Sequence, residues 1–222
     1  MTGRLESFSI REVDLLAQAS YRRYVMPNLD KEQMEQALRD LGDLLASRGQ
    51  HYELVLIGGG NLMLRGLITR TTTKDLDLLG ERTAETVAPL RPLPPELARA
   101  IGDVAVNLGL ALDWINLGPE SLLDLGLPIG FEERLERVAY GDGLGIWLAS
   151  RFDMVCFKLY AAVDQGTRSH HFQDLRELRP SRDELLSAAR WTISHDPSAG
   201  YRSLLVAVLG QMGVAHADAA LG

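Results

Sequence analysis

One stretch, residues 54–79, constrains the fold of this chain more than any other: LVLIGGGNLMLRGLITRTTTKDLDLL. It begins with an unbroken apolar run, which is typical of a strand covered on both faces. Gly58 to Gly60 follow, and glycines at such a point allow a sharp turn and leave backbone N–H groups open to an anion. We therefore expect a strand, a glycine turn, a short helix from Asn61 whose first turn favours negative charge, a basic hydroxyl-rich loop and a second strand ending near Leu79.

The second strand carries two aspartates, Asp75 and Asp77. Side chains alternate between the faces of a strand, so both carboxylates point the same way, while Leu76 and Leu78 point into the core. Adjacent carboxylates repel each other unless a cation lies between them. Mg²⁺ or Mn²⁺ suits such oxygen ligands, since Mg²⁺ commonly binds one or two carboxylates together with substrate phosphates. The pattern predicts a metal–nucleotide site; a hairpin strand with two solvated aspartates is the alternative.

The glycine turn and the aspartate pair together resemble a known signature. Gly58-Gly59 followed by Asp75-Leu76-Asp77 is similar to the motif of the nucleotidyltransferase superfamily with the DNA polymerase β-type fold. The context RTTTKDLDLL is most similar to the AbiEii-type branch, which includes toxins of bacterial toxin–antitoxin systems. The resemblance implies that Asp75 and Asp77 are catalytic metal ligands, and that the nucleotide is bound by Gly58, Gly59, Asn61, Arg70 and Lys74.

A third carboxylate is expected from residues 110–117 (LALDWINL), which predict a third strand. Asp113 alternates there with Leu112 and Trp114, and by resemblance it matches the third acidic residue of the family. That match implies a catalytic role as general base or as a metal ligand. Asn116 is expected to support the site. An edge-strand aspartate facing water is the alternative.

A second motif lies in the helical region that begins at Ser150. Lys158 interrupts an apolar helical run, where a lysine usually extends its charged end to solvent. The string FKLYAAVDQGTRSHHFQDL, however, resembles the second conserved block of the AbiEii-type families: a lysine in a KL-x-A run, a basic turn and an Asp-Leu pair. The resemblance implies that Lys158 contacts the nucleotide phosphates, and that Asp174 pairs with the lysine or supports nucleotide binding. Arg168 lies in the turn.

Two adjacent histidines, His170 and His171, follow in the same turn. Neighbouring residues on a helix do not face each other, and no further His or Cys follows at metal-ligand spacing. We therefore expect capping and surface roles for this pair.

Composition narrows the function classes. A net charge of −7 makes the chain no obvious nucleic-acid binder, although basic residues gather near the predicted site at Arg65, Arg70, Lys74 and Arg82. No stretch approaches the ~20 apolar residues of a membrane span, and the N-terminus lacks the apolar core of a signal peptide. The single cysteine, Cys156, excludes an internal disulfide and fits a reducing, cytoplasmic location.

The remaining pattern predicts an α/β (α+β) fold: a mixed nucleotidyltransferase-type sheet of at least five strands flanked by helices. Residues 1–149 form the expected core, with N-terminal helices over residues 4–25 and 30–47, and residues 150–222 form a C-terminal helical region. Residues 80–95 are charged and rich in proline, which favours a loop.

These expectations define a metal-dependent nucleotidyltransferase that moves a nucleoside monophosphate from an NTP, such as ATP, to a hydroxyl of RNA (tRNA among the candidates) or protein. The resemblance adds a toxin role with a cognate antitoxin. A catalytically silent binding protein and a small-molecule, antibiotic-type nucleotidyltransferase remain alternatives, and a homodimer remains open. A P-loop or dinucleotide site is excluded because the glycine turn lacks Gly-Lys-Ser/Thr and Met63 stands where a third glycine would be required.

Overall fold

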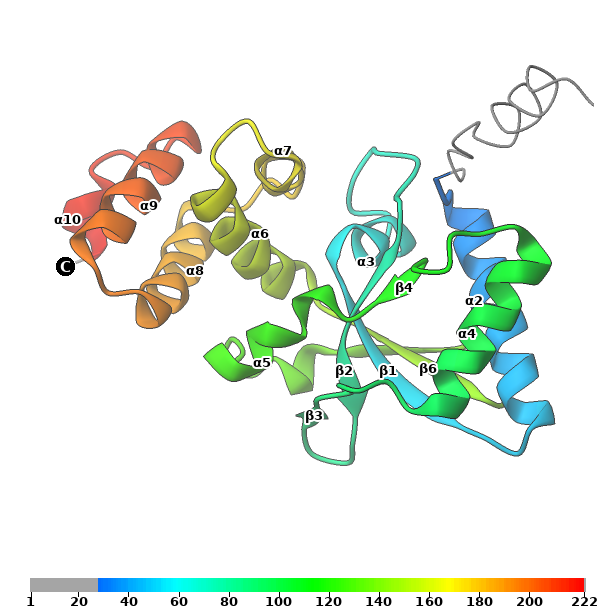
Figure 1. Cartoon of the computed structure of the whole chain (residues 1–222). Helices are drawn as coiled ribbons and strands as arrows, with labels where there is room; N and C mark the ends of the chain where they lie inside the picture. Colours follow the sequence, from blue (N-terminus) through cyan, green and yellow to red (C-terminus); the bar gives the residue numbers. More distant parts are fainter. Residues whose placement is uncertain (1–27, 222) are drawn as a thin grey trace, which may run out of the picture.

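The computed structural model describes residues 28–221. A six-stranded mixed sheet lies at the centre, with helices on both faces (Figure 1). Strand β1 (Tyr52–Ile57) runs parallel to β6 (Leu144–Leu148) and antiparallel to β2 (Leu76–Arg82). Strand β5 (Glu136–Ala139) continues the sheet beside β6. On the other side, β3 (Val87–Ala88) pairs antiparallel with β2, and β4 (Ile115–Asn116) pairs parallel with it. The predicted fold class is confirmed.

Helices α2 (Lys31–Ser47) and α4 (Pro95–Leu108) cover one face of the sheet (Figure 1). A capping box starts α2, because Asp30 accepts from the N–H of Gln33 and the Gln33 side chain accepts from the N–H of Asp30. Alternate residues of the strands are buried against these helices, which the period of two along a strand requires. They include Leu54, Leu56, Leu76 and Leu78.

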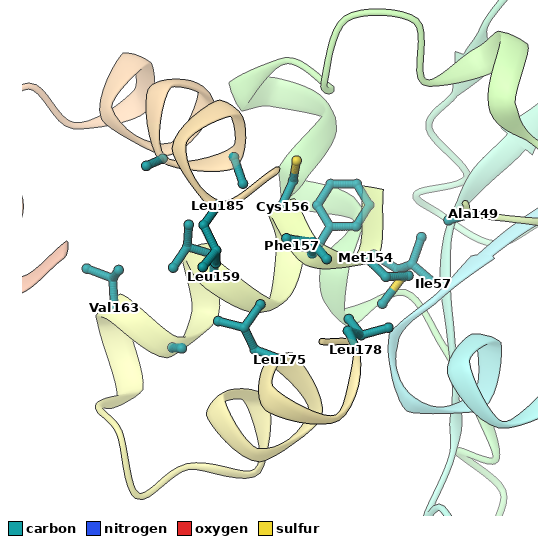
Figure 2. Close-up of a cluster of buried hydrophobic side chains, with 14 of the residues drawn as sticks. Ile57, Ala149, Met154, Cys156, Phe157, Leu159, Val163, Leu175, Leu178 and Leu185 are labelled. Carbon is teal, nitrogen blue, oxygen red and sulfur yellow. The ribbon is translucent and has the colours of Figure 1, made fainter. Parts of the chain in front are cut away.

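The other face of β1 packs on the C-terminal helices. These are α6 (Arg151–Gln165), α7 (His170–Glu177), α8 (Arg182–His195), α9 (Ala199–Gln211) and α10 (Ala217–Leu221). Figure 2 shows Ile57 and Ala149 of the sheet region beside α6, and residues of α7 and α8 on the far side of that helix. Cys156 is fully buried in this core, and burial raises the pKa of its thiol to about 12.

Short elements connect these layers. Helix α3 (Gly58–Leu64) follows β1 directly. Between β4 and β5 lie two 3₁₀ turns and one short helix: η1 (Gly118–Ser121), α5 (Leu122–Leu125) and η2 (Glu132–Arg134). Each C-terminal helix from α6 to α9 begins after a serine that caps it: Ser150, Ser169, Ser181 and Ser198. None of the described helices is long and apolar enough to cross a membrane.

Several predicted boundaries were wrong. The third strand covers only Ile115–Asn116 instead of residues 110–117, because the chain turns first. The cause is Trp114, which is fully buried and donates its indole N–H to Ile101 O at 3.1 Å, so residues 110–114 must fold back under α4. Asp113 therefore lies in a turn and not on the strand.

Three smaller corrections follow. Helix α3 begins at Gly58 and not at Asn61, strand β2 continues to Arg82, and β3 lies within the expected loop 80–95. The expected helix over residues 4–25 lies outside the described residues.

Candidate active site

A cleft of about 1030 Å³ lies where the ends of β1 and β2 meet the C-terminal helices. One face of helix α6 lines it, because residues three and four positions apart lie on the same side of a helix: Met154, Phe157, Lys158, Tyr160, Ala161, Asp164 and Gln165. The cleft is at the upper end of the roughly 300–1,000 Å³ of common small-ligand sites, so it has room for a nucleotide. Seven of the predicted site residues line it: Gly58, Gly59, Arg70, Lys74, Asp75, Asp77 and Lys158.

Glycine is required at positions 58 and 59 because neighbouring side chains leave no room for a β-carbon. Gly58 has φ +73°, a conformation that favours glycine, and a β-carbon there would overlap the Asp77 carboxylate. At Gly59 a β-carbon would lie 2.5 Å from the Arg70 guanidinium. The sequence interpretation assigned these glycines to phosphate binding alone. The structure shows that they also allow Asp77 and Arg70 to reach the cleft.

The two carboxylates face one region and disfavour each other's charge. Burial raises the pKa of Asp77, and the negative charge of Asp75 raises it further. Burial also raises the pKa of Asp75, to which the charge of Asp113 adds. Asn116, next to Asp77 in the β2–β4 ladder, donates its amide N–H to Asp77 Oδ1 at 3.4 Å and opposes this shift.

Opposite the carboxylates stands a buried ion pair. Lys158 Nζ lies 2.7 Å from Asp174 Oδ2, and each side chain is only 4% exposed. Lys158 therefore does not extend to solvent, and the pairing expected for Asp174 is confirmed. Arg70 reaches the same carboxylate oxygen at 3.3 Å. Two cations on one anion leave this group with a net positive charge, which suits a polyphosphate.

Residues 32–177 match the family described as nucleotidyltransferase of unknown function, DUF6036. The match covers most of the chain and includes both motifs, from the glycines after β1 to Asp174 in α7. The chain belongs to this nucleotidyltransferase family. No curated protein and no solved structure matched in the corresponding searches.

The sequence interpretation missed the histidine pair. His170 and His171 line the cleft, with ring centroids 3.8 Å apart, whereas the serine before them caps α7. Burial and the neighbouring Lys158 charge lower the pKa of His171 to about 4. Burial also lowers the pKa of His170. Both imidazoles are therefore neutral at pH 7. Their position within the same block, separated from the Asp174-Leu175 pair by two residues, was the available signal.

Three predicted residues do not line the cleft: Asn61, Asp113 and Asp174, of which Asp174 lies behind Lys158 as its ion-pair partner. Asn61 is fully buried and donates to Ala149 O at 3.2 Å, because α3 starts three residues earlier than expected and turns this side chain inward. Asp113 has a 64% exposed side chain and contacts Lys74 Nζ at 3.4 Å. The expected line of three carboxylates is therefore not formed on neighbouring strands. No group of three His, Cys, Asp or Glu side chains with metal-holding geometry occurs within residues 28–221.

A divalent cation nevertheless fits the residues of this cleft. Asp75 and Asp77 are acceptor-only groups when ionised, and burial raises the pKa of each, so a bound cation would favour their charged forms. The glycine at position 58 leaves the Asp77 carboxylate uncovered on that side. Two carboxylates, with phosphate oxygens and waters as further ligands, form an appropriate set for Mg²⁺.

Proposed function

We propose that this chain is a metal-dependent nucleotidyltransferase that moves a nucleoside monophosphate from an NTP to an acceptor hydroxyl and releases pyrophosphate. One observation carries the proposal: a single cleft contains two carboxylates of raised pKa and, from separate elements, the cationic group of Lys158 and Arg70 on Asp174. An NTP has the complementary chemistry, because its triphosphate can bind both a cation and the positive group.

In the reaction, the acceptor oxygen forms a bond to the α-phosphorus while the bond from that phosphorus to the β-phosphate oxygen breaks. Asp75 and Asp77 would hold Mg²⁺ or Mn²⁺, which supplies charge neutralisation to the phosphate oxygens when bound. Lys158 and Arg70 stabilise the negative charge that develops on the leaving pyrophosphate. Gly58 and Gly59 let the triphosphate approach the backbone.

A base must remove the proton from the acceptor hydroxyl during the transfer. Asp113 is our first candidate, because its charge acts on Asp75 and raises the pKa of that group. Its carboxylate is exposed and therefore accessible to a bulky acceptor, and Lys74 holds it at 3.4 Å. Lys74 in turn also lines the cleft, where it can contact phosphate.

The finer assignment is a toxin nucleotidyltransferase of the AbiEii type that modifies an RNA end or a protein and has a cognate antitoxin. It rests on the resemblance of two sequence blocks, and it is supported by the meeting of their key residues, since Arg70 of the first block and Lys158 of the second share Asp174. A silent binding protein remains the second candidate, favoured by the placement of Asn116 beside Asp77, where the family resemblance implies a carboxylate.

A transfer assay tests the proposal. The purified chain is incubated with each α-labelled NTP, Mg²⁺, and either total RNA or cell lysate, beside an Asp77→Asn variant of the same shape. We expect label in RNA or protein with the wild type only. Transfer by Asp77→Asn at the wild-type rate would contradict the assignment. Mg²⁺-dependent NTP binding without any transfer would instead support the silent binding protein.

A further inference from the structure

Aromatic side chains occupy part of the cleft that the transfer chemistry does not use. Phe157 and Tyr160 reach the cleft from α6, and Tyr201 reaches it from α9. The rings of Tyr160 and Tyr201 lie 6.3 Å apart at an angle of 42°. Trp191 of α8 supports Tyr160 from the side, with ring centroids 5.9 Å apart at 63°. The result is a half-buried aromatic wall held by three helices.

The Tyr201 hydroxyl in this wall lacks a partner. It is buried, and no atom of the described residues makes a hydrogen bond with it. Thr192 lies close enough to lower the pKa of the Tyr201 hydroxyl, but its own hydroxyl donates to Ala189 O at 2.9 Å. A buried hydroxyl without a hydrogen bond lowers stability unless a ligand provides the partner. The pKa of this hydroxyl is raised to about 12 by burial, so it stays a donor at neutral pH.

A carboxylate lies beside the aromatic wall. Asp196 follows the end of α8 and lines the cleft. Its Oδ1 accepts the backbone N–H of Ser198 at 2.9 Å, which lowers the pKa of Asp196 and keeps it ionised. An ionised carboxylate only accepts hydrogen bonds, and it therefore selects ligands that carry N–H donors.

We infer that the base of the donor NTP stacks on Tyr160 and Tyr201, with the Tyr201 hydroxyl and Asp196 at its polar edge. This inference rests on the proposed function, which places the triphosphate in the same cleft. A nucleobase combines the two required properties: a flat π-surface and an edge with donors and acceptors. Adenine, guanine and cytosine carry an exocyclic amino group that can donate to Asp196, and guanine and uracil carry a ring N–H that can do so.

This subsite lies partly outside the family match. Asp196 and Tyr201 follow residue 177, at which the match ends, whereas Lys158 and Asp174 precede it. The phosphate-binding and carboxylate groups thus belong to the family segment, and base selection depends on the helices that follow.

Equilibrium binding of the full chain tests the inference, with labelled NTPs and inorganic tripolyphosphate as probes in the presence of Mg²⁺. Tyr160→Ala removes one stacking ring, and we expect NTP binding to weaken by roughly 5- to 150-fold. Tyr201→Phe removes only the hydroxyl, for which roughly 2- to 10-fold is expected. Tripolyphosphate has no base, so its affinity stays at the wild-type value in both variants. Tyr140→Phe, a buried tyrosine outside the cleft, is the matched control.

The outcomes separate this inference from the proposed function. Unchanged NTP affinity in both variants, with tripolyphosphate still bound, overturns the base subsite and leaves the transferase proposal intact. Lost transfer with unchanged NTP affinity also overturns it, because the rings then contact the acceptor. A wild-type chain that binds neither probe contradicts both proposals. Tyr201→Phe without ligand should melt no lower than the wild type, so this variant stays informative even if Tyr160→Ala fails to fold.

Discussion

Lys158 Nζ lies 2.7 Å from Asp174 Oδ2 in the interior of the molecule, and Arg70 approaches the same oxygen from the loop before β2 at 3.3 Å. The geometry is therefore unequal: Asp174 has two cationic partners, whereas the Lys158 ammonium depends on one carboxylate. This asymmetry makes the two residues differ in their effect on stability.

Asp174→Ala should destabilise the fold more than Lys158→Met. Loss of Asp174 leaves a buried ammonium unpaired, which costs about 3–5 kcal/mol, whereas loss of Lys158 leaves Asp174 with Arg70 and should cost less than half of that. Thermal unfolding should show the difference as a Tm gap of several degrees. Asp218→Ala, which breaks an exposed pair with Arg202, is the matched control and should cost at most about 1 kcal/mol. Equal losses for both cleft variants would contradict the unequal geometry.

Gly58→Ala should cost more than Gly66→Ala. Both glycines have positive φ, +73° and +65°, so both variants acquire backbone strain. A methyl group at position 58 also overlaps the Asp77 carboxylate, whereas no described atom lies within 4 Å at position 66. We expect an additional loss of roughly 1–3 kcal/mol for Gly58→Ala, measured by denaturant unfolding. Adding Asp77→Ala should recover much of that excess; no recovery would show that the strain has another source.

Asn116→Asp should increase metal affinity and decrease stability without metal. The new carboxylate would stand beside Asp77 in the β2–β4 ladder, where the amide now donates to Asp77 Oδ1. A third negative charge raises repulsion and strengthens cation binding, so Mg²⁺ should raise the Tm of this variant more than that of the wild type.

Asp113→Asn tests whether Asp113 is the base that removes the proton from the acceptor hydroxyl. The exposed position of Asp113 predicts a stability change within about 0.5 kcal/mol. If Asp113 deprotonates the acceptor, transfer falls by roughly 10²–10⁴-fold while NTP binding stays constant. An undiminished transfer rate would assign the base to another group.

His171 should make the fold less stable in mild acid. Its pKa is about 4 in the folded chain against an ordinary value of 6.5, so the unfolded chain binds more protons between these values. The contribution to stability is complete above about pH 6.5 and is lost as the pH falls toward 4. Comparing wild type with His171→Asn at each pH cancels the other titrating groups, and the Tm advantage of the wild type should shrink on acidification.

His51→Asn provides a control of opposite sign. The backbone carbonyl of Asp142 and the Glu53 carboxylate raise the pKa of His51, so its contribution is present in acid and is lost as the pH rises through the folded-state pKa. Parallel pH profiles for the two variants would refute the assignment of the His171 effect.

Local sequence patterns determined where the helices and strands of this protein lie. The alternation in β1 and β2 placed Leu76 and Leu78 in the core and both aspartates on the other side, because the period of a strand is a property of the backbone. The serine and aspartate caps also marked helix starts correctly at Lys31, Arg151 and Arg182, since a cap bonds to residues only three positions away.

Tertiary structure alone decided which side chains share the cleft. Burial of Trp114 turns the chain before β4, so Asn116 stands beside Asp77 and Asp113 does not. Docking of α8 and α9 brings Tyr201 into contact with Tyr160, although 41 positions separate them in the sequence. Such contacts depend on how whole elements pack, and a motif of a few residues contains no information about that packing. The sequence by itself determined the carboxylate pair and the lysine, and the packing determined what surrounds them.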